Sequence, residues 1–112
     1  MKITYSEALR QSGDLFELAQ RASQILEKVA TRSSHLAAAE WDFDRDEQGR
    51  AVVRLRLSDW IGSVTERFSL ADLSDSEALF GRLNGLWGDL LAIRSHRLLD
   101  ELDKSFSDSG GS

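Results

Sequence analysis

Three aspartates at alternate positions are the residues whose spacing most suggests chemistry. Asp42, Asp44 and Asp46 match the first ligand positions of a calcium-binding loop. Such a loop also needs a glycine at its sixth position, where the chain bends, and a glutamate at its twelfth, which closes the coordination shell. The chain has Glu47 and Val53 at those positions. We therefore expect no metal site, and we assign the aspartates to ion pairs with the arginines of the next strand.

The two histidines, His35 and His96, are the other candidates for acid–base chemistry, because histidine titrates near neutral pH. Neither has a carboxylate or a nucleophile at a recognisable spacing, so we expect surface or capping roles. The glycines of residues 81–88 lack the preceding strand and the Gly-Lys-Ser/Thr ending of a phosphate-binding loop. The absence of cysteine excludes thiolate catalysis and cysteine-ligated zinc. The sequence therefore predicts a protein that is not an enzyme and holds no cofactor.

Two large apolar residues, Trp60 and Ile61, stand together in a predicted turn over residues 59–62. They are either folded under a helix end or displayed to a partner, and tryptophan is often the residue that contributes most to an interface. We favour burial of the two slightly; if they are displayed, they are the first candidates for partner binding. Arg94 and Arg97 form a small basic cluster and are the other candidate partner-binding residues.

Composition limits the kinds of partner. The chain has 112 residues, enough for one domain, with 14 basic and 19 acidic side chains and a net charge of −5. A chain this acidic binds phosphates poorly, so we expect no nucleic acid, and a basic protein partner is favoured. No apolar run approaches the roughly 20 residues of a membrane-spanning helix, and the N-terminal residues are polar. We expect no membrane contact and a cytoplasmic location.

A long helix over residues 74–106 is the element around which the chain is arranged. It opens with a predicted capping box at 74–77 and carries apolar residues at helical spacing over about 28–30 residues, or about 42–45 Å. A line of small residues runs along it at positions i, i+4, i+7 and i+11: Gly81, Gly85, Gly88 and Ala92. Each interior glycine costs a helix up to about 1 kcal/mol. The line therefore predicts a groove where another helix packs closely.

A β-hairpin is predicted over residues 39–57. Its loop is residues 47–49, with Gly49 in the left-handed conformation, so that Asp46 pairs with Arg50. This register places apolar residues opposite one another on one face and opposite charges on the other: Phe43 with Val53, Trp41 with Leu55, Ala39 with Leu57, Asp42 with Arg54, and Glu40 with Arg56. A slip by one residue would destroy both patterns.

The whole chain reads as an α+β fold with the order α-β-β-β-α. A first helix is predicted from a capping box of Thr4 and Glu7 through Ala30, with either a kink at Gly13 or a start at Ser12, and a third strand is predicted over 64–70. We expect a three-stranded antiparallel meander with one face covered by two long helices, a single domain over 1–104 and a flexible tail over 105–112. The last helix is longer than the strands, about 27 Å for eight residues, so it must overhang the sheet. This favours a homodimer over a monomer.

These features predict a small acidic, non-enzymatic protein–protein interaction module: an adaptor, a chaperone-like binder or an inhibitor of the immunity-protein type. We expect it to act through a sheet edge, the Trp60/Ile61 turn and the long C-terminal helix. The alternative is a structural homo-oligomer assembled through the Gly81/Gly85/Gly88 helix face. An enzyme or small-ligand carrier would need a polar pocket that these residues do not suggest.

Overall fold

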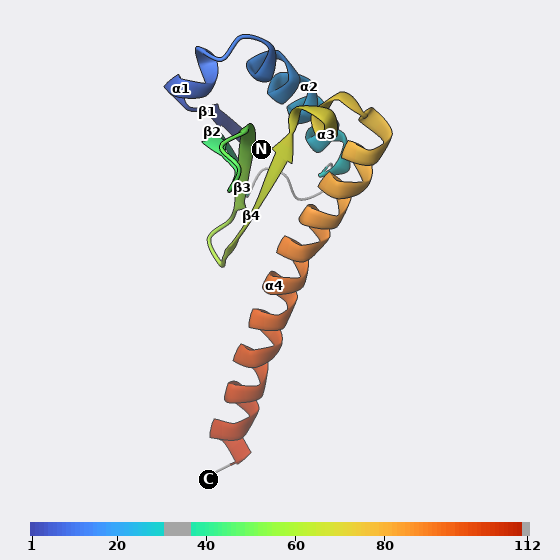
Figure 1. Ribbon diagram of the computed structural model, residues 1–112. Helices are drawn as coiled ribbons and strands as arrows, with labels where there is room; N and C mark the ends of the chain where they lie inside the picture. The colour runs from blue at the N-terminus through green and yellow to red at the C-terminus, as the bar shows by residue number, and fades with distance from the viewer. Residues whose placement is uncertain (31–36, 111–112) are drawn as a thin grey trace.

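The computed structural model describes residues 1–30 and 37–110. Its elements in chain order are β1 (Lys2–Tyr5), α1 (Glu7–Arg10), α2 (Asp14–Val29), β2 (Ala38–Arg45), β3 (Ala51–Ser58), β4 (Ser63–Ser69), α3 (Leu70–Ser74) and α4 (Ser76–Gly110). The strands form one sheet in the order β1-β2-β3-β4, in which β1 is parallel to β2 and the other neighbours are antiparallel. Two long helices, α2 and α4, cover one face of this sheet (Figure 1). The predicted α+β class and the covered meander are confirmed.

The predicted hairpin register is also confirmed. Trp41 pairs with Leu55, and the other predicted partners face each other along β2 and β3. The backbone N–H of Asp46 donates to the carbonyl of Arg50 at 2.9 Å, which closes the loop. Gly49 has a φ of 78°, the left-handed conformation that the loop requires. Apolar side chains on one face therefore lie against the helices.

The first strand was missed, because Thr4 was predicted to cap a helix. Residues 2–5 instead pair in parallel with residues 38–41 of β2. The first helical turn begins after Ser6, whose Oγ accepts a hydrogen bond from the N–H of Leu9 at 3.2 Å. The long helix α2 starts only after Gly13, whose φ of 56° changes the direction of the chain. A parallel pair requires a crossover between its strands, so no local sequence signal announces it.

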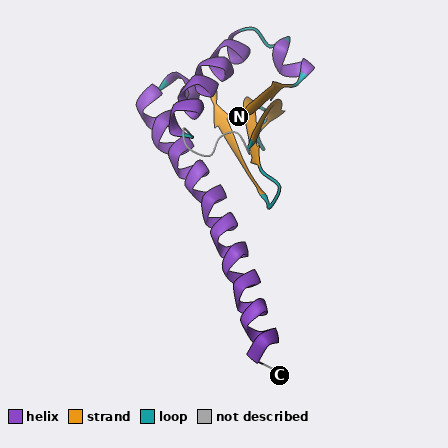
Figure 2. Ribbon diagram, turned by 180° about the vertical axis from the view of Figure 1, so that it is seen from behind, coloured by secondary structure: helices purple, strands orange, loops and turns teal. Residues whose placement is uncertain are grey.

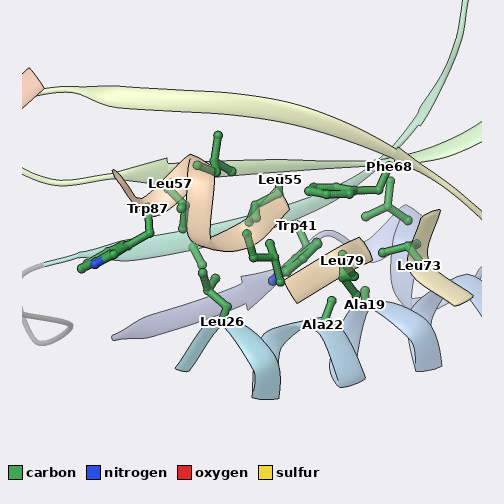
Figure 3. Packing of buried hydrophobic residues seen from close by; sticks show 14 of the residues in the cluster. Ala19, Ala22, Leu26, Trp41, Leu55, Leu57, Phe68, Leu73, Leu79 and Trp87 are labelled. Carbon is green, nitrogen blue, oxygen red and sulfur yellow. The ribbon is translucent and has the colours of Figure 1, made fainter. Parts of the chain in front are cut away.

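The core lies between the sheet and the two long helices (Figure 3). Small residues of α2, Ala19 and Ala22, are fully buried and let α4 approach closely. The larger side chains come from α2, from the strands and from one stripe of α4: Leu26, Trp41, Leu55, Leu57, Phe68, Leu79, Leu83, Leu86, Trp87 and Leu90. Each such Leu contributes about 1.5–3 kcal/mol by its burial, so this stripe fixes the orientation of α4.

The predicted capping box at residues 74–77 is wrong, because residue 74 is the last of α3. The first turn of α4 is capped by Asp75, whose Oδ1 accepts from the N–H of Ala78 at 3.2 Å. A reciprocal capping box occurs one element earlier, at the start of α3, between Ser69 and Asp72. Asp and Ser both cap helices well, so a sequence rich in both offers several alternative starting points.

The line of small residues on α4 faces away from the core. Gly81, Gly85, Gly88 and Ala92 are all exposed, and a Cβ added at any of the three glycines would meet no atom within 4 Å. The prediction that another helix packs closely on this line is therefore wrong for the described part of the chain, where α2 packs on the opposite side of α4. At 100° per residue the line lies on the side of α4 opposite the buried leucine stripe. Assembly of a second chain on this line stays a prediction.

The long helix overhangs the sheet as predicted. It has 35 residues, or about 52 Å of helix, in a molecule that measures 62 × 29 × 24 Å. Figures 1 and 2 show its C-terminal half continuing past the strands. The helical backbone runs to Gly110, beyond the expected boundary at 104, and a separate tail over 105–112 stays a prediction.

Candidate functional site

The turn between β3 and β4 displays a tryptophan. Trp60 is 74% exposed, whereas Trp41 and Trp87 are 1% and 6% exposed. The slight preference for burial of Trp60 was therefore wrong, and its neighbour Ile61 is half-buried. An indole surrounded by water is a large apolar surface that a partner can cover. The residues around Trp60 determine whether the backbone of its turn is held in place.

A carboxylate inside the turn holds the backbone beneath Trp60. The Asp59 side chain is only 1% exposed. Its Oδ1 accepts from the N–H of Ile61 at 2.8 Å and from the N–H of Gly62 at 3.0 Å. The backbone N–H of Asp59 donates in turn to the Gly62 carbonyl at 2.9 Å. Asp is favoured in turns because its side chain can bond the backbone two residues ahead.

The same carboxylate joins the turn to α4. Oδ2 of Asp59 accepts from Nη2 of Arg94 at 2.7 Å and from Nε at 3.0 Å. The Arg94 side chain is 17% exposed, so this is a largely buried ion pair. Arg94, predicted to contact a partner, has its guanidinium engaged within the chain. We therefore assign it the role of positioning the turn.

The protonation of Asp59 follows from these contacts. Burial acts to raise the pKa of its carboxyl, because a charge is poorly solvated inside a protein. The hydrogen bonds from the Gly62 N–H, the Arg94 guanidinium and the Ile61 N–H outweigh burial, and the pKa lies below its ordinary value. Asp59 is therefore ionised at neutral pH, and the ion pair is fully formed there.

A close contact adds to the ion pair. A Cβ built on Gly62 would lie 2.9 Å from Cγ2 of Ile93, so a larger residue at this position would force the Ile93 side chain or the turn to shift. The turn is thus held by a charge pair on one side and by van der Waals contact on the other. The backbone beneath Trp60 therefore loses little conformational freedom when the exposed side chain binds a partner.

An open hollow of about 570 Å³ lies between the turn and α4, lined by Ile61, Ala92, Ile93, His96, Arg97 and Asp100. We call these residues together with Trp60 the Trp60 surface. Ile93 is 38% exposed, and Nε2 of His96 lies 3.8 Å from Oδ2 of Asp100. Arg97, a predicted partner-binding residue, makes no ion pair in the described part of the chain. The surface therefore combines an apolar centre, formed by Ile61 and Ile93, with the charged side chains of Arg97 and Asp100.

The aspartates and His96, which were considered for chemistry, lie at sites where their contacts serve the fold or where they are exposed on the surface. Three aspartates pair with arginines: Asp42 with Arg54 at 2.9 Å, Asp44 with Arg67 at 3.0 Å and Asp46 with Arg50 at 3.1 Å. Glu40 and Arg56 face each other in register, as predicted, but form no ion pair in residues 1–30 and 37–110. His35 lies outside the described residues, and His96 borders the hollow beside Ile61.

Comparison with protein-family models, curated proteins and solved structures gives no match to this chain. The function has to be inferred from the side chains themselves. No helix within residues 1–30 and 37–110 is both long enough and apolar enough to cross a membrane. A cytoplasmic location stays a prediction from the sequence.

Proposed function

We propose that the chain is a non-enzymatic protein–protein interaction module that binds another protein through the Trp60 surface. One observation carries this proposal: an exposed Trp60 stands on a turn that is fixed by a buried carboxylate and its arginine. Residues that dominate interfaces are typically Trp, Tyr and Arg in positions that a partner can desolvate fully. A surface that is rigid before binding keeps more of its contact energy as affinity.

The surface also suggests the chemistry of its partner. The hollow between Ile61 and Ile93 would take an apolar side chain, and Arg97 at the rim would pair with an acidic group. At longer range the net charge of −5 favours a partner that is basic overall, because it raises the rate of encounter. An adaptor, a chaperone-like binder or an inhibitor of the immunity-protein type would each use such a surface.

Site-specific cross-linking in the source cell tests the proposal. Trp60 is replaced by a photoreactive phenylalanine analogue, and the matched control carries the same analogue at Gln24, an exposed position on α2. We expect one defined adduct with another protein from position 60 and none from position 24. Identical adducts from both positions, or none from position 60, would remove the basis for the proposal.

The alternative is a structural homo-oligomer assembled through the Gly81/Gly85/Gly88 face. It is favoured by the position of these glycines, which lie open along the outer side of a helix that they weaken. Light scattering of the wild type and of Gly85→Leu separates the two functions. Oligomers that Gly85→Leu disrupts and Trp60→Ala leaves intact would support the alternative, as would a position-60 adduct made only with a second copy.

A further inference from the structure

The sheet has two outer edges, β1 and β4, and they differ in whether side chains bond their outward-facing backbone groups. At the β4 edge, Nη2 of Arg82 donates to the Arg67 carbonyl at 2.9 Å, and the N–H of Ser69 donates to Oδ2 of Asp72 at 2.9 Å. Arg82 and Asp72 are themselves paired at 2.8 Å. These side chains occupy backbone groups that an added strand would need. Proteins commonly block their edge strands in this way.

The Arg82 side chain is itself firmly held. Its guanidinium lies 4.4 Å from the centre of the Phe68 ring, and it bonds Oε1 of Glu66 at 3.0 Å. Cation–π contact and two carboxylates together fix it over the end of β4. The C-terminal half of this edge is therefore closed to a partner strand.

No described side chain blocks the β1 edge in this way. The N–H of Lys2 donates to the Ala37 carbonyl at 3.2 Å, and that of Ser6 to the Trp41 carbonyl at 2.9 Å, so the even-numbered residues bond toward β2. The alternation of a parallel ladder turns the backbone groups of Ile3 and Tyr5 outward. No strand lies beyond β1 in the described part of the chain. Within residues 1–30 and 37–110, this edge therefore presents backbone donors and acceptors that no other strand uses.

Two hollows flank the same strand. One, of about 590 Å³, lies on the uncovered polar face of the sheet. Thr4, Tyr5 and Glu40 line its end beside β1, and its lining farther across the sheet includes Asp42, Arg54 and Arg56. The other, of about 550 Å³, is lined by Tyr5, Glu7, Arg10 and Gln11. Tyr5 borders both. Successive side chains of an added strand point to opposite faces, so neighbouring residues would enter the two hollows in turn.

The charge beside this edge indicates which side chain would enter the polar hollow. Glu40 is the register partner of Thr4 and is the charged residue of β2 nearest to this edge. On its other side it faces Arg56, but it forms no ion pair in the described residues. A strand added next to β1 would lie about 10 Å from β2, since neighbouring strands are about 4.8 Å apart. A Lys or Arg side chain can cover much of that distance over the small Thr4 and bring its charge to Glu40.

We propose that the β1 edge accepts an extended segment of a partner protein as a fifth strand, with a Lys or Arg beside Thr4. The backbone groups of Ile3 and Tyr5 supply the main-chain hydrogen bonds, and the two hollows select the side chains, as in other cases of strand addition. This site is separate from the Trp60 surface and does not rest on the function proposed for it.

A displayed library of random nine-residue peptides, selected on the full chain, tests this proposal. We expect enriched sequences that contain Lys or Arg at one position and lack proline. The synthesised peptide should protect the amide protons of Ile3 and Tyr5 from exchange. Glu40→Gln should weaken its binding about fivefold, as for an exposed charge pair, whereas Glu27→Gln on α2 should leave it unchanged. Ile3→Pro removes the outward N–H and part of the side chain that packs against the core, but it leaves the hydrogen bonds from β1 to β2 in place; it should abolish binding in a protein of unchanged circular dichroism.

Several outcomes would overturn the proposal. Failure of any peptide to enrich, or equal affinity for the wild type and Ile3→Pro, would show that this edge takes no strand. A peptide whose binding is lost in Trp60→Ala, with the amides of Ile3 and Tyr5 still unprotected, would bind at the Trp60 surface. That result would refute the edge proposal and support the proposed function, so the two can fail separately.

Discussion

Replacing Asp59 with asparagine separates the two roles of its carboxylate. The amide oxygen of the new side chain can still accept from the N–H groups of Ile61 and Gly62, so the turn keeps its internal bonds. The negative charge is lost, however, and the second acceptor facing Arg94 becomes an N–H₂ donor. The substitution therefore leaves a mostly buried guanidinium without its partner, and the turn loses its main connection to α4.

The expected loss of stability can be worked from the burial of this pair. Removing one partner of a buried ion pair costs about 3–5 kcal/mol, because the remaining charge is desolvated and uncompensated. Arg94 retains 17% exposure beside an open hollow, so water recovers part of this loss. We expect Asp59→Asn to lower the free energy of unfolding by about 2–3 kcal/mol. Urea denaturation followed by circular dichroism measures it.

The hairpin loop offers a matched control. Asp46 makes contacts of the same kind as Asp59, with one fewer bond to its arginine: its Oδ1 accepts from the N–H groups of Gln48 and Arg50, and its Oδ2 from Nε of Arg50. The Arg50 side chain, however, is 72% exposed, so Asp46→Asn should lose several-fold less stability. Equal losses in the two variants would refute the reasoning, because burial would then add nothing to the Asp59–Arg94 pair.

The pH dependence of the free energy of unfolding tests the same prediction in a second way. Asp59 has a lowered pKa in the folded chain, so its contribution is complete above the unfolded value of about 3.9 and is lost as pH falls through the folded value. The stability gap between the wild type and Asp59→Asn should stay constant from neutral pH to about pH 5 and close in stronger acid. A gap that persists unchanged at pH 2 would contradict the assignment.

Three further substitutions test other parts of the structure. Gly85→Ala should stabilise the isolated chain by about 0.5–1 kcal/mol, measured as a raised urea midpoint, because the added methyl group has open space; destabilisation would show that something covers this face. Gly62→Ala should destabilise by about 1–3 kcal/mol through its contact with Ile93, and Ile93→Ala in the same chain should recover part of the loss; additive effects would contradict the contact. Arg54→Ala should change the thermal midpoint little, because its partner Asp42 and its own side chain are well exposed; a large drop would mean that this face of the sheet is covered.

The parts of the fold that could be predicted from sequence are those with two independent local signals. In the hairpin, the turn residue Gly49 and the alternation of apolar and charged residues select the same register. The overhang of α4 followed from length alone. By contrast, β1 has four residues and pairs with a strand beyond α2, so its pattern was too short to compete with the apparent capping box at Thr4.

The site was harder to predict because its contacts join distant positions. Trp60 and Ile61 were recognisable as unusual turn residues, but the sequence does not show which way a turn faces. The pair that fixes this turn, Asp59 and Arg94, is separated by 35 positions, and nothing in the spacing links them. The error at Gly85 has another cause: helical periodicity shows which residues share a face, and the competing leucine stripe decides which face is buried.

The most direct test of the central claim is the affinity of the purified partner, once cross-linking at position 60 has identified it. Isothermal titration of this partner into the wild type, Trp60→Ala and the control Gln24→Ala compares the Trp60 surface with an exposed site elsewhere on the chain. If Trp60 is the residue that the fixed turn presents for binding, Trp60→Ala should raise Kd at least about 30-fold, equivalent to about 2 kcal/mol, and Gln24→Ala should leave it unchanged. Equal affinities for all three proteins would contradict the account.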